Sequence, residues 1–538
     1  MRERVAPALG VPMPPAHPLA PMRLLLLAAA LAAAPLAAQP VPDVAFSGDG
    51  FTAPIEFPVV SQVDIAVDAQ GRALVAADIQ ISGQPATGVV TRLGSNGEPD
   101  EFGGARVVTI PVDPSETVTY LTTDRVVAVL DGRIAVTGQA SIEADSVSRF
   151  VSFVAMFLPD GRPDPSFGTG GVAQLPFSER IYAVAAAADG LYLGGRSGEG
   201  RATVARVLYS GMPDPDFGDG GIAKGPNGLC AALSIRPDGR ILAAGGTSAT
   251  SNGSLDILLF SLLPSGLLDE TFAGDGVMTE DLFGENDIAL GLTLLPDGRA
   301  IVSGQASKRG NTEYGTLLYL VGADGTPDAG FGFEGWAWTD VRLNNAETGG
   351  YETPGQPYAL AGGGFGVLVG GVHVPGFAAL GLAANGNPLA SYGPRGVTNL
   401  FENQPRLLFT AAVGSGDVAY ASGIQASADG TRRAFVARIL LSAPTASELG
   451  LMRASGLAVA PNPVARMARV TVTLAETAHA AVRVVDALGR TVAMLHDGPL
   501  AAGDHVLALD ASGLPAGVYA VVATAGGTQR VTRVTIVR

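Results

Sequence analysis

Histidine and cysteine, which many catalytic and metal sites use, are scarce in the long middle part of the chain. Between residues 39 and 442 there is one histidine, His373 in GGVHVPG, and one cysteine, Cys230 in GLCAALSI. The apolar and glycine neighbours of His373 favour a structural position, and those of Cys230 favour the core. The sequence therefore predicts neither a Ser-His-Asp hydrolase nor a histidine-rich zinc site, while carboxylate chemistry remains open.

Three aspartates in DPDFGDGG, Asp214, Asp216 and Asp219, have the composition of a loop that binds calcium through oxygen ligands. Their spacing is not that of an EF-hand, and the closing glutamate is missing. Related phrases elsewhere in the chain place Ser166 or Gly330 where this one has Asp216. We therefore expect these aspartates to cap turns and expect no cofactor, with calcium as the alternative.

Two short phrases alternate along the middle of the chain, and each occurs seven times. One is a turn-like phrase with an aromatic anchor, such as MPDPDFGDGGI from Met212, and the other resembles PDGRILAAGG from Pro237. Repetition at this period indicates a repeat architecture. The anchors are Phe46, Phe102, Phe167, Phe217, Phe272, Phe331 and Tyr392.

Each repeat reads as four short antiparallel strands. Asp238 and Gly239, between two apolar runs, predict a two-residue hairpin turn in which both residues have positive φ. Four strands per unit of about 55 residues, without helical periodicity, match the blade of a β-propeller. The first aromatic phrase precedes the first four strands and none follows the last four, so head-to-tail closure predicts a ring of seven blades. An open β-solenoid, which uses shorter repeats, is the alternative.

The repeat phrases resemble those of the bacterial delta-60 type repeats. The run DGRPDPSFGTGGV from Asp160 matches that family nearly letter for letter, and the resemblance covers about residues 42 to 442. It implies a β-propeller but carries no general biochemical activity. Departures from the pattern at Gly362, Tyr392 and Gly414 make the last two blades less regular.

Residues 458–538 differ in kind from the repeats and follow a linker at 443–457. Alternating apolar residues in runs of five to eight predict a small Ig-like β-sandwich of about seven strands. Several phrases resemble the type IX secretion sorting domain, which implies recognition by the outer-membrane translocon. The final Arg538 departs from that family, in which a final lysine is common. An ordinary Ig-like binding module is the alternative. The motif residues are Pro461, Asn462, Pro463, Asp486, Gly489, Arg490, Leu514, Pro515, Gly517 and Tyr519.

The first 38 residues are expected to be a signal peptide whose true start is Met22. From there Arg23 precedes an apolar run and small residues suited to signal peptidase. No stretch is long enough to cross a bilayer, so we expect a protein that is not integral to the membrane and is secreted or displayed at the cell surface. A net charge of -16 makes nucleic-acid binding improbable.

Three functions remain open for the repeat ring. We favour a recognition or scaffold module that binds an unknown glycan or protein and is not an enzyme, because the loops are short and alike. The alternatives are a secreted lyase or glycosidase with paired carboxylates at the central channel, and a structural surface-layer component.

One long insertion, from Thr339 to Tyr358, includes Glu347, Tyr351 and Glu352, and we expect it to be a solvated loop.

Overall fold

The chain folds almost entirely into β-strands. The computed structural model describes residues 40–441 and 457–537, except 44–45, 48–50, 54–58, 80–85, 101, 103, 146, 176–179, 248–253, 309–312, 342–351, 361–362, 372–376, 401–406, 414–417, 427–430, 461, 465, 475–477, 486–490, 502 and 526–527. In these ranges the only helical elements are two 3-10 turns, η2 (Ala390–Tyr392) and η3 (Pro394–Gly396), and no helix is long and apolar enough to cross a membrane. The predicted all-β class is confirmed.

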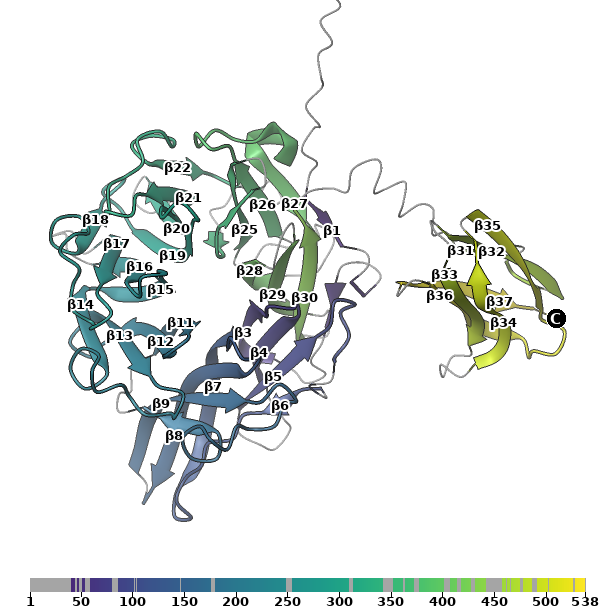
Figure 1. Cartoon of the computed structure of the whole chain (residues 1–538), viewed down its shortest axis with the longest axis horizontal. Coiled ribbons are helices and arrows are strands. Elements are labelled where there is room, and N and C mark those ends of the chain that lie inside the picture. The colour runs from purple at the N-terminus through teal and green to yellow at the C-terminus, as the bar shows by residue number, and fades with distance from the viewer. Residues whose placement is uncertain are drawn as a thin grey trace, which may run out of the picture. The chain divides into compact units, whose positions relative to one another are not determined.

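Seven antiparallel sheets in the described part of residues 41–440 surround a common centre (Figure 1). We number them sheets 1 to 7 along the chain. Sheets 1 to 5 each have four strands in sequence order: β3 (Val59–Val67), β4 (Ala73–Ile79), β5 (Thr87–Leu93) and β6 (Arg106–Val107); β7 (Thr117–Ala128), β8 (Ile134–Ala144), β9 (Val147–Phe157) and β10 (Val172–Gln174); β11 (Ile181–Ala187), β12 (Gly190–Arg196), β13 (Arg201–Val207) and β14 (Ile222–Asn227); β15 (Leu229–Ile235), β16 (Ile241–Thr247), β17 (Asp256–Leu262) and β18 (Val277–Glu280); β19 (Asp287–Leu294), β20 (Ala300–Lys308), β21 (Glu313–Val321) and β22 (Trp336–Thr339).

Sheets 6 and 7 are less regular, and sheet 7 takes strands from both ends of the array. Sheet 6 contains β23 (Glu352–Pro354), β24 (Tyr358–Ala359), β25 (Phe365–Gly371), β26 (Phe377–Leu382) and β27 (Val397–Leu400). Sheet 7 contains β28 (Leu407–Val413), β29 (Val418–Ala426) and β30 (Arg432–Leu440), and β30 also pairs with β1 (Val41–Pro42) and β2 (Phe51–Thr52). The N-terminal segment therefore completes the last sheet, and this pairing covers an edge that would otherwise be exposed.

The hairpin turns differ from the prediction of two-residue turns. In sheet 4, Ile235 pairs with Ile241, so the connection runs from Arg236 to Arg240. The N–H of Gly239 donates to the carbonyl of Arg236, and the N–H of Arg236 donates to the carbonyl of Arg240. Gly239 alone has positive φ, at 84°, because this longer turn needs one left-handed residue before the strand resumes.

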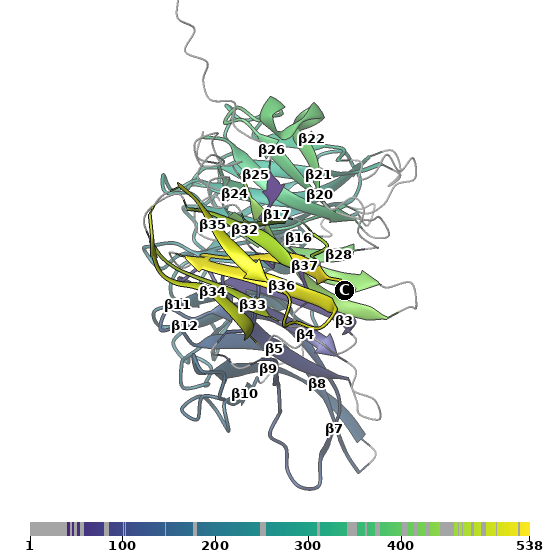
Figure 2. The same cartoon turned by 90° about the vertical axis from the view of Figure 1, so that its right-hand side faces the viewer.

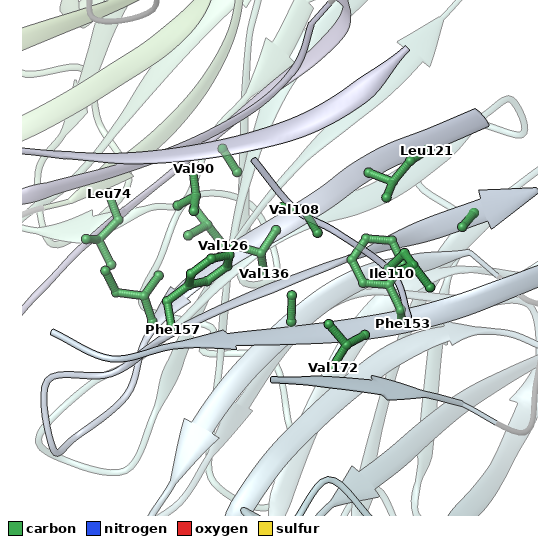
Figure 3. Packing of buried hydrophobic residues seen from close by; sticks show 14 of the residues in the cluster. Leu74, Val90, Val108, Ile110, Leu121, Val126, Val136, Phe153, Phe157 and Val172 are labelled. Atoms are coloured by element: carbon green, nitrogen blue, oxygen red, sulfur yellow. The ribbon is translucent and has the colours of Figure 1, made fainter. Parts of the chain in front are cut away.

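Buried apolar side chains fill the spaces between neighbouring sheets. Figure 3 shows the core between sheets 1 and 2, where Leu74 and Val90 lie near Val126, Val136 and Phe157. All seven aromatic anchors are buried. Backbone hydrogen bonds also link the sheets: the residue after Phe167, for example, donates its N–H to the carbonyl of Ser210 in sheet 3.

Residues 457–537 form two further antiparallel sheets around one core. One has the order β31 (Leu457–Ala460), β32 (Met467–Leu474) and β35 (Gly503–Asp510). The other, visible in Figure 2, has the order β34 (Thr491–Leu500), β33 (Ala478–Val485), β36 (Gly517–Ala525) and β37 (Thr528–Ile536). Val470 and Leu509 of the first sheet belong to the same buried cluster as Val482, Val521 and Val534 of the second.

Candidate functional site

The first strands of the sheets enclose a cavity of about 640 Å³. Its wall comes from β3, β7, β11, β15 and β19 and from residues 353–356, which end the long insertion. Alanine, valine, leucine, isoleucine and glycine dominate this wall. Among the described lining residues, Asp64 and Arg125 alone are charged. A mostly apolar cavity with a few polar groups is the usual form of a small-ligand site.

The two charged residues form an ion pair between sheets 1 and 2. Nη1 of Arg125 lies 3.9 Å from Oδ1 of Asp64, and Oδ2 of Asp64 accepts a hydrogen bond of 2.8 Å from the N–H of Val126. Asp64 is 5% exposed. Burial raises the pKa of Asp64, and the positive charge of Arg125 opposes that rise.

Arg125 also joins sheet 2 to sheet 3. Its Nε donates to the carbonyl of Tyr182 at 2.7 Å, and its Nη1 donates to the carbonyl of Asp124 at 2.9 Å. The pairing register of β7 shifts between Thr123 and Arg125, so Asp124 occupies a β-bulge. Bulges re-aim side chains, and this one lets two successive charged residues of β7 take part in one network.

Asp124 forms a second ion pair behind the cavity wall. Its Oδ1 accepts a hydrogen bond of 3.0 Å from Nε of Arg180, the residue that precedes β11. Burial raises the pKa of Asp124 to about 6, although Arg180 and Arg125 lower it, and the negative charge of Asp78 adds to the rise. Oδ1 of Asp78 accepts hydrogen bonds from the N–H and the hydroxyl of Thr123. Carboxylates and guanidinium groups from sheets 1, 2 and 3 thus form one network of hydrogen bonds and ion pairs at this part of the cavity wall.

The described wall carries few charged groups. Glycoside hydrolysis uses two carboxyl groups that flank the scissile bond. In the described part of the cavity wall Asp64 is the one carboxylate, and its two oxygens face Arg125 and the N–H of Val126. The site can instead offer a ligand an apolar surface and one fixed pair of opposite charges.

The aspartates of the calcium-like loop have other partners in the structure. Oδ1 of Asp214 accepts a hydrogen bond from the N–H of Asp216, and Oδ2 lies 3.0 Å from Nη1 of Arg206. Asp214 thus caps the turn, as the sequence predicts. Among the described residues, no group of three or more His, Cys, Asp or Glu side chains is placed to hold a metal ion. Cys230 is fully buried, and burial raises the pKa of its thiol to about 12.

The structure describes only part of the predicted motif in the C-terminal sheets. Asn462 donates from Nδ2 to the carbonyl of Arg533 and accepts through Oδ1 from the N–H of Thr535, so it binds the last strand. The hydroxyl of the buried Tyr519 donates to the carbonyl of Pro515 at 2.9 Å. Pro463 and Gly517 are exposed, and Leu514 is half-buried. Pro461, Asp486, Gly489, Arg490 and Arg538 lie outside the described residues.

Sequence reasoning missed the charged residues of the cavity. His373, Glu347 and Tyr351, which it considered, lie outside the described residues, as do Gly362, Gly414, the segment 1–38 and the linker up to residue 456. One signal was available: Asp64, Asp124 and Arg125 are the charged residues of β3 and β7, whereas the first strand β11 has none in IYAVAAA.

Two family models match parts of the chain. Residues 458–538 match a secretion system C-terminal sorting domain, and residues 236–272 match a domain of unknown function (DUF5122) described as a β-propeller. No curated protein matches the chain. The first match reports the export machinery that handles the protein, and the second reports its repeat architecture.

Solved structures similar to the chain share little sequence with it. A protein of unknown function from Dyadobacter fermentans is 13% identical, with 75% of this chain and 98% of that chain covered and a TM-score of 0.37. PorZ, a surface component of the type IX secretion system of Porphyromonas gingivalis, is 12% identical, with 88% and 74% covered and a TM-score of 0.30. A GH43_1 enzyme from Xanthomonas citri is 10% identical, with 72% and 89% covered and a TM-score of 0.28.

Similarity at this level carries no conclusion about function. The two family matches, together with the ring of antiparallel sheets, identify the chain. It is a β-propeller repeat protein with a C-terminal type IX secretion sorting domain, exported to the cell surface or secreted.

Proposed function

We propose that the protein is an exported recognition module whose ligand site is the central cavity at Asp64 and Arg125. The observation that carries this proposal is the ion pair of Asp64 and Arg125, the two charged residues in the described part of the wall. A fixed pair of opposite charges orients a polar ligand, and the apolar wall adds contact area. The ligand class that fits is a glycan terminus or a protein segment that offers polar groups to both charges.

The finer architecture belongs to the same proposal. The seven sheets and the pairing of β1 and β2 with β30 support a seven-bladed propeller over residues 39–442. The seven aromatic anchors would hold neighbouring blades together. Residues 1–38 would be the signal peptide with Met22 as start, residues 443–457 the linker, and residues 458–538 an Ig-like sandwich that the translocon recognises through motif positions such as Asn462 and Gly517.

A binding experiment on the mature chain tests the ligand site. Purified envelope polysaccharides and a glycan array are probed with the wild-type protein, with Arg125→Gln and with Arg162→Gln. Arg162 is a matched control because it is an exposed arginine of sheet 2 that pairs with Asp160. We expect glycan binding that Arg125→Gln removes and Arg162→Gln keeps.

Two results would overturn the proposal. Release of new reducing ends from a polysaccharide panel would favour the alternative of a secreted lyase or glycosidase. Binding to no glycan and to no envelope protein would favour a structural surface-layer component. Thermal unfolding of each variant shows whether a loss of binding reflects a loss of fold.

A further inference from the structure

A second cavity, of about 290 Å³, lies on sheet 3. Leu193, Ala205 and Ile222 give it an apolar surface, and Gly194 and Gly195 add no side-chain volume. These residues come from β12, β13 and β14, so the cavity spans most of the width of the sheet.

Comparison with the other sheets explains why space remains here. A glycine recurs in the second strand of sheets 2 to 5, at Gly138, Gly195, Gly245 and Gly304. The residue paired with it on the third strand is Phe153 in sheet 2, Leu258 in sheet 4 and Leu317 in sheet 5, and all three are fully buried. Sheet 3 has the smaller Thr203 at this position.

The next position of the third strand on the same face of the sheet also has a smaller side chain in sheet 3 than in sheets 4 and 5. Sheets 4 and 5 have Phe260 and Tyr319 two residues further along the third strand, whereas sheet 3 has Ala205. Sheet 2 also has an alanine there, Ala155, but Phe153 beside it supplies the volume. The pair of Thr203 and Ala205 therefore leaves space on sheet 3 that Leu258 and Phe260 occupy on sheet 4, and this space is open to a small ligand.

Charged side chains at the cavity define what that occupant carries. Arg180 and Lys224 line it, with side chains about half exposed. Glu199 pairs with Lys224 at 3.2 Å, and both members of this pair are exposed, which makes the pair weak and open to exchange. A ligand anion can take the place of Glu199 beside Lys224, whereas Arg180 is paired with Asp124.

We infer that this cavity binds a small amphiphilic anion, with its apolar body over Leu193, Ala205 and Ile222 and its anionic group beside Lys224. The inference is independent of the proposed glycan or protein site, because the two cavities have no described lining residue in common. A carboxylate, sulfonate or phosphate on an aliphatic or aromatic body meets the requirement.

The test uses the full mature chain and two probes, 1-anilinonaphthalene-8-sulfonate and a series of straight-chain carboxylates from butanoate to decanoate. We expect saturable fluorescence of the sulfonate, displaced by the carboxylates. Affinity should rise about fourfold per added methylene while the chain fits, and then level off. Octanol, which lacks the anion, should displace the probe less well than octanoate.

Variants locate the binding. Thr203→Leu with Ala205→Phe copies the pair Leu258 and Phe260 of sheet 4, and we expect it to abolish probe binding while the melting temperature stays equal or rises. Thr203→Leu alone is the milder version if the double variant does not fold. Lys224→Gln should weaken octanoate binding about tenfold and leave octanol unchanged, and Arg162→Gln should change neither.

Clear results would overturn the inference. One is the absence of saturable binding of either probe to the wild-type chain. The other is wild-type affinity in a folded variant that carries Thr203→Leu. Equal loss of octanoate and octanol binding in Lys224→Gln would contradict the role of the anion.

Discussion

The guanidinium of Arg438 lies 3.1 Å from the carboxylate of Asp43, and the N–H of Asp43 donates to the carbonyl of Arg438 at 2.8 Å. Asp43 belongs to the first aromatic phrase and Arg438 to the last strand of the array. Both side chains are largely buried, at 6% and 19% exposure. This contact therefore adds a charged pair to the backbone pairing that closes the ring.

Replacing Asp43 by alanine should open this closure. The change leaves the Arg438 guanidinium largely buried without its carboxylate, and we expect a loss of about 3 kcal/mol in the free energy of unfolding, measured with urea. Arg162→Ala, which removes an exposed pair with Asp160, serves as the control and should have no measurable effect. Equal stability of the two variants would contradict the role of Asp43 in closure.

Cys230 should be unreactive in the folded protein. Its thiol is fully buried, and burial raises its pKa to about 12, so the reactive thiolate is scarce at neutral pH. We expect a thiol reagent such as dithionitrobenzoate to leave the native chain unmodified over hours and to titrate one thiol in denaturant. Rapid reaction of the native protein would show that the strand β15 opens locally.

Asp287 should make stability fall as the pH rises. Burial raises its pKa to about 7, and Asp281 and Asp256 add to the rise. In the unfolded chain the pKa of an aspartate is about 3.9. Between about pH 4 and pH 7 the folded state therefore holds a proton that the unfolded state has lost, and stability drops over this pH range. Asp287→Asn should remove this pH dependence. The same pH dependence of the free energy of unfolding in wild type and in Asp287→Asn, measured with urea, would refute the assignment of this dependence to Asp287.

Deletion of residues 458–538 should stop export at the periplasm, because this segment carries the sorting domain. Cell fractionation and protease accessibility at the surface measure the outcome. Undiminished surface display of the truncated chain would contradict a sorting role for these residues.

Asn462 should hold the last strand of the C-terminal sheets. Asn462→Ala removes the hydrogen bonds to the carbonyl of Arg533 and the N–H of Thr535, and we expect a loss of about 1 kcal/mol. Ser512→Ala is the control, because Ser512 binds Asp510 through its N–H and its hydroxyl, and Asp510 belongs to β35 rather than β37. Hydrogen exchange of β37 should increase in the first variant and stay unchanged in the second.

Local patterns predicted much of the fold. Alternating apolar residues mark the strands, and the order of the aromatic phrases predicted that the N-terminus joins the last set of strands, where β1 pairs with β30. The turn after Arg236 was the error: Asp238 and Gly239 read as a two-residue turn, but their neighbours also belong to the connection. A short dipeptide marks the place of a turn better than its length, because the register also depends on the paired strands.

The sequence by itself determined the repeat, its strand content and the sorting domain, because turns and strand alternation depend on residues close in the chain. Tertiary structure alone decided that Asp64 and Arg125 meet at one cavity and that Arg180 pairs with Asp124, since these residues come from three sheets. It also decided that Thr203 and Ala205 leave space beside Lys224. Such sites depend on which strands face one another across the ring. The spacing of residues along the chain does not show how far apart they lie in space.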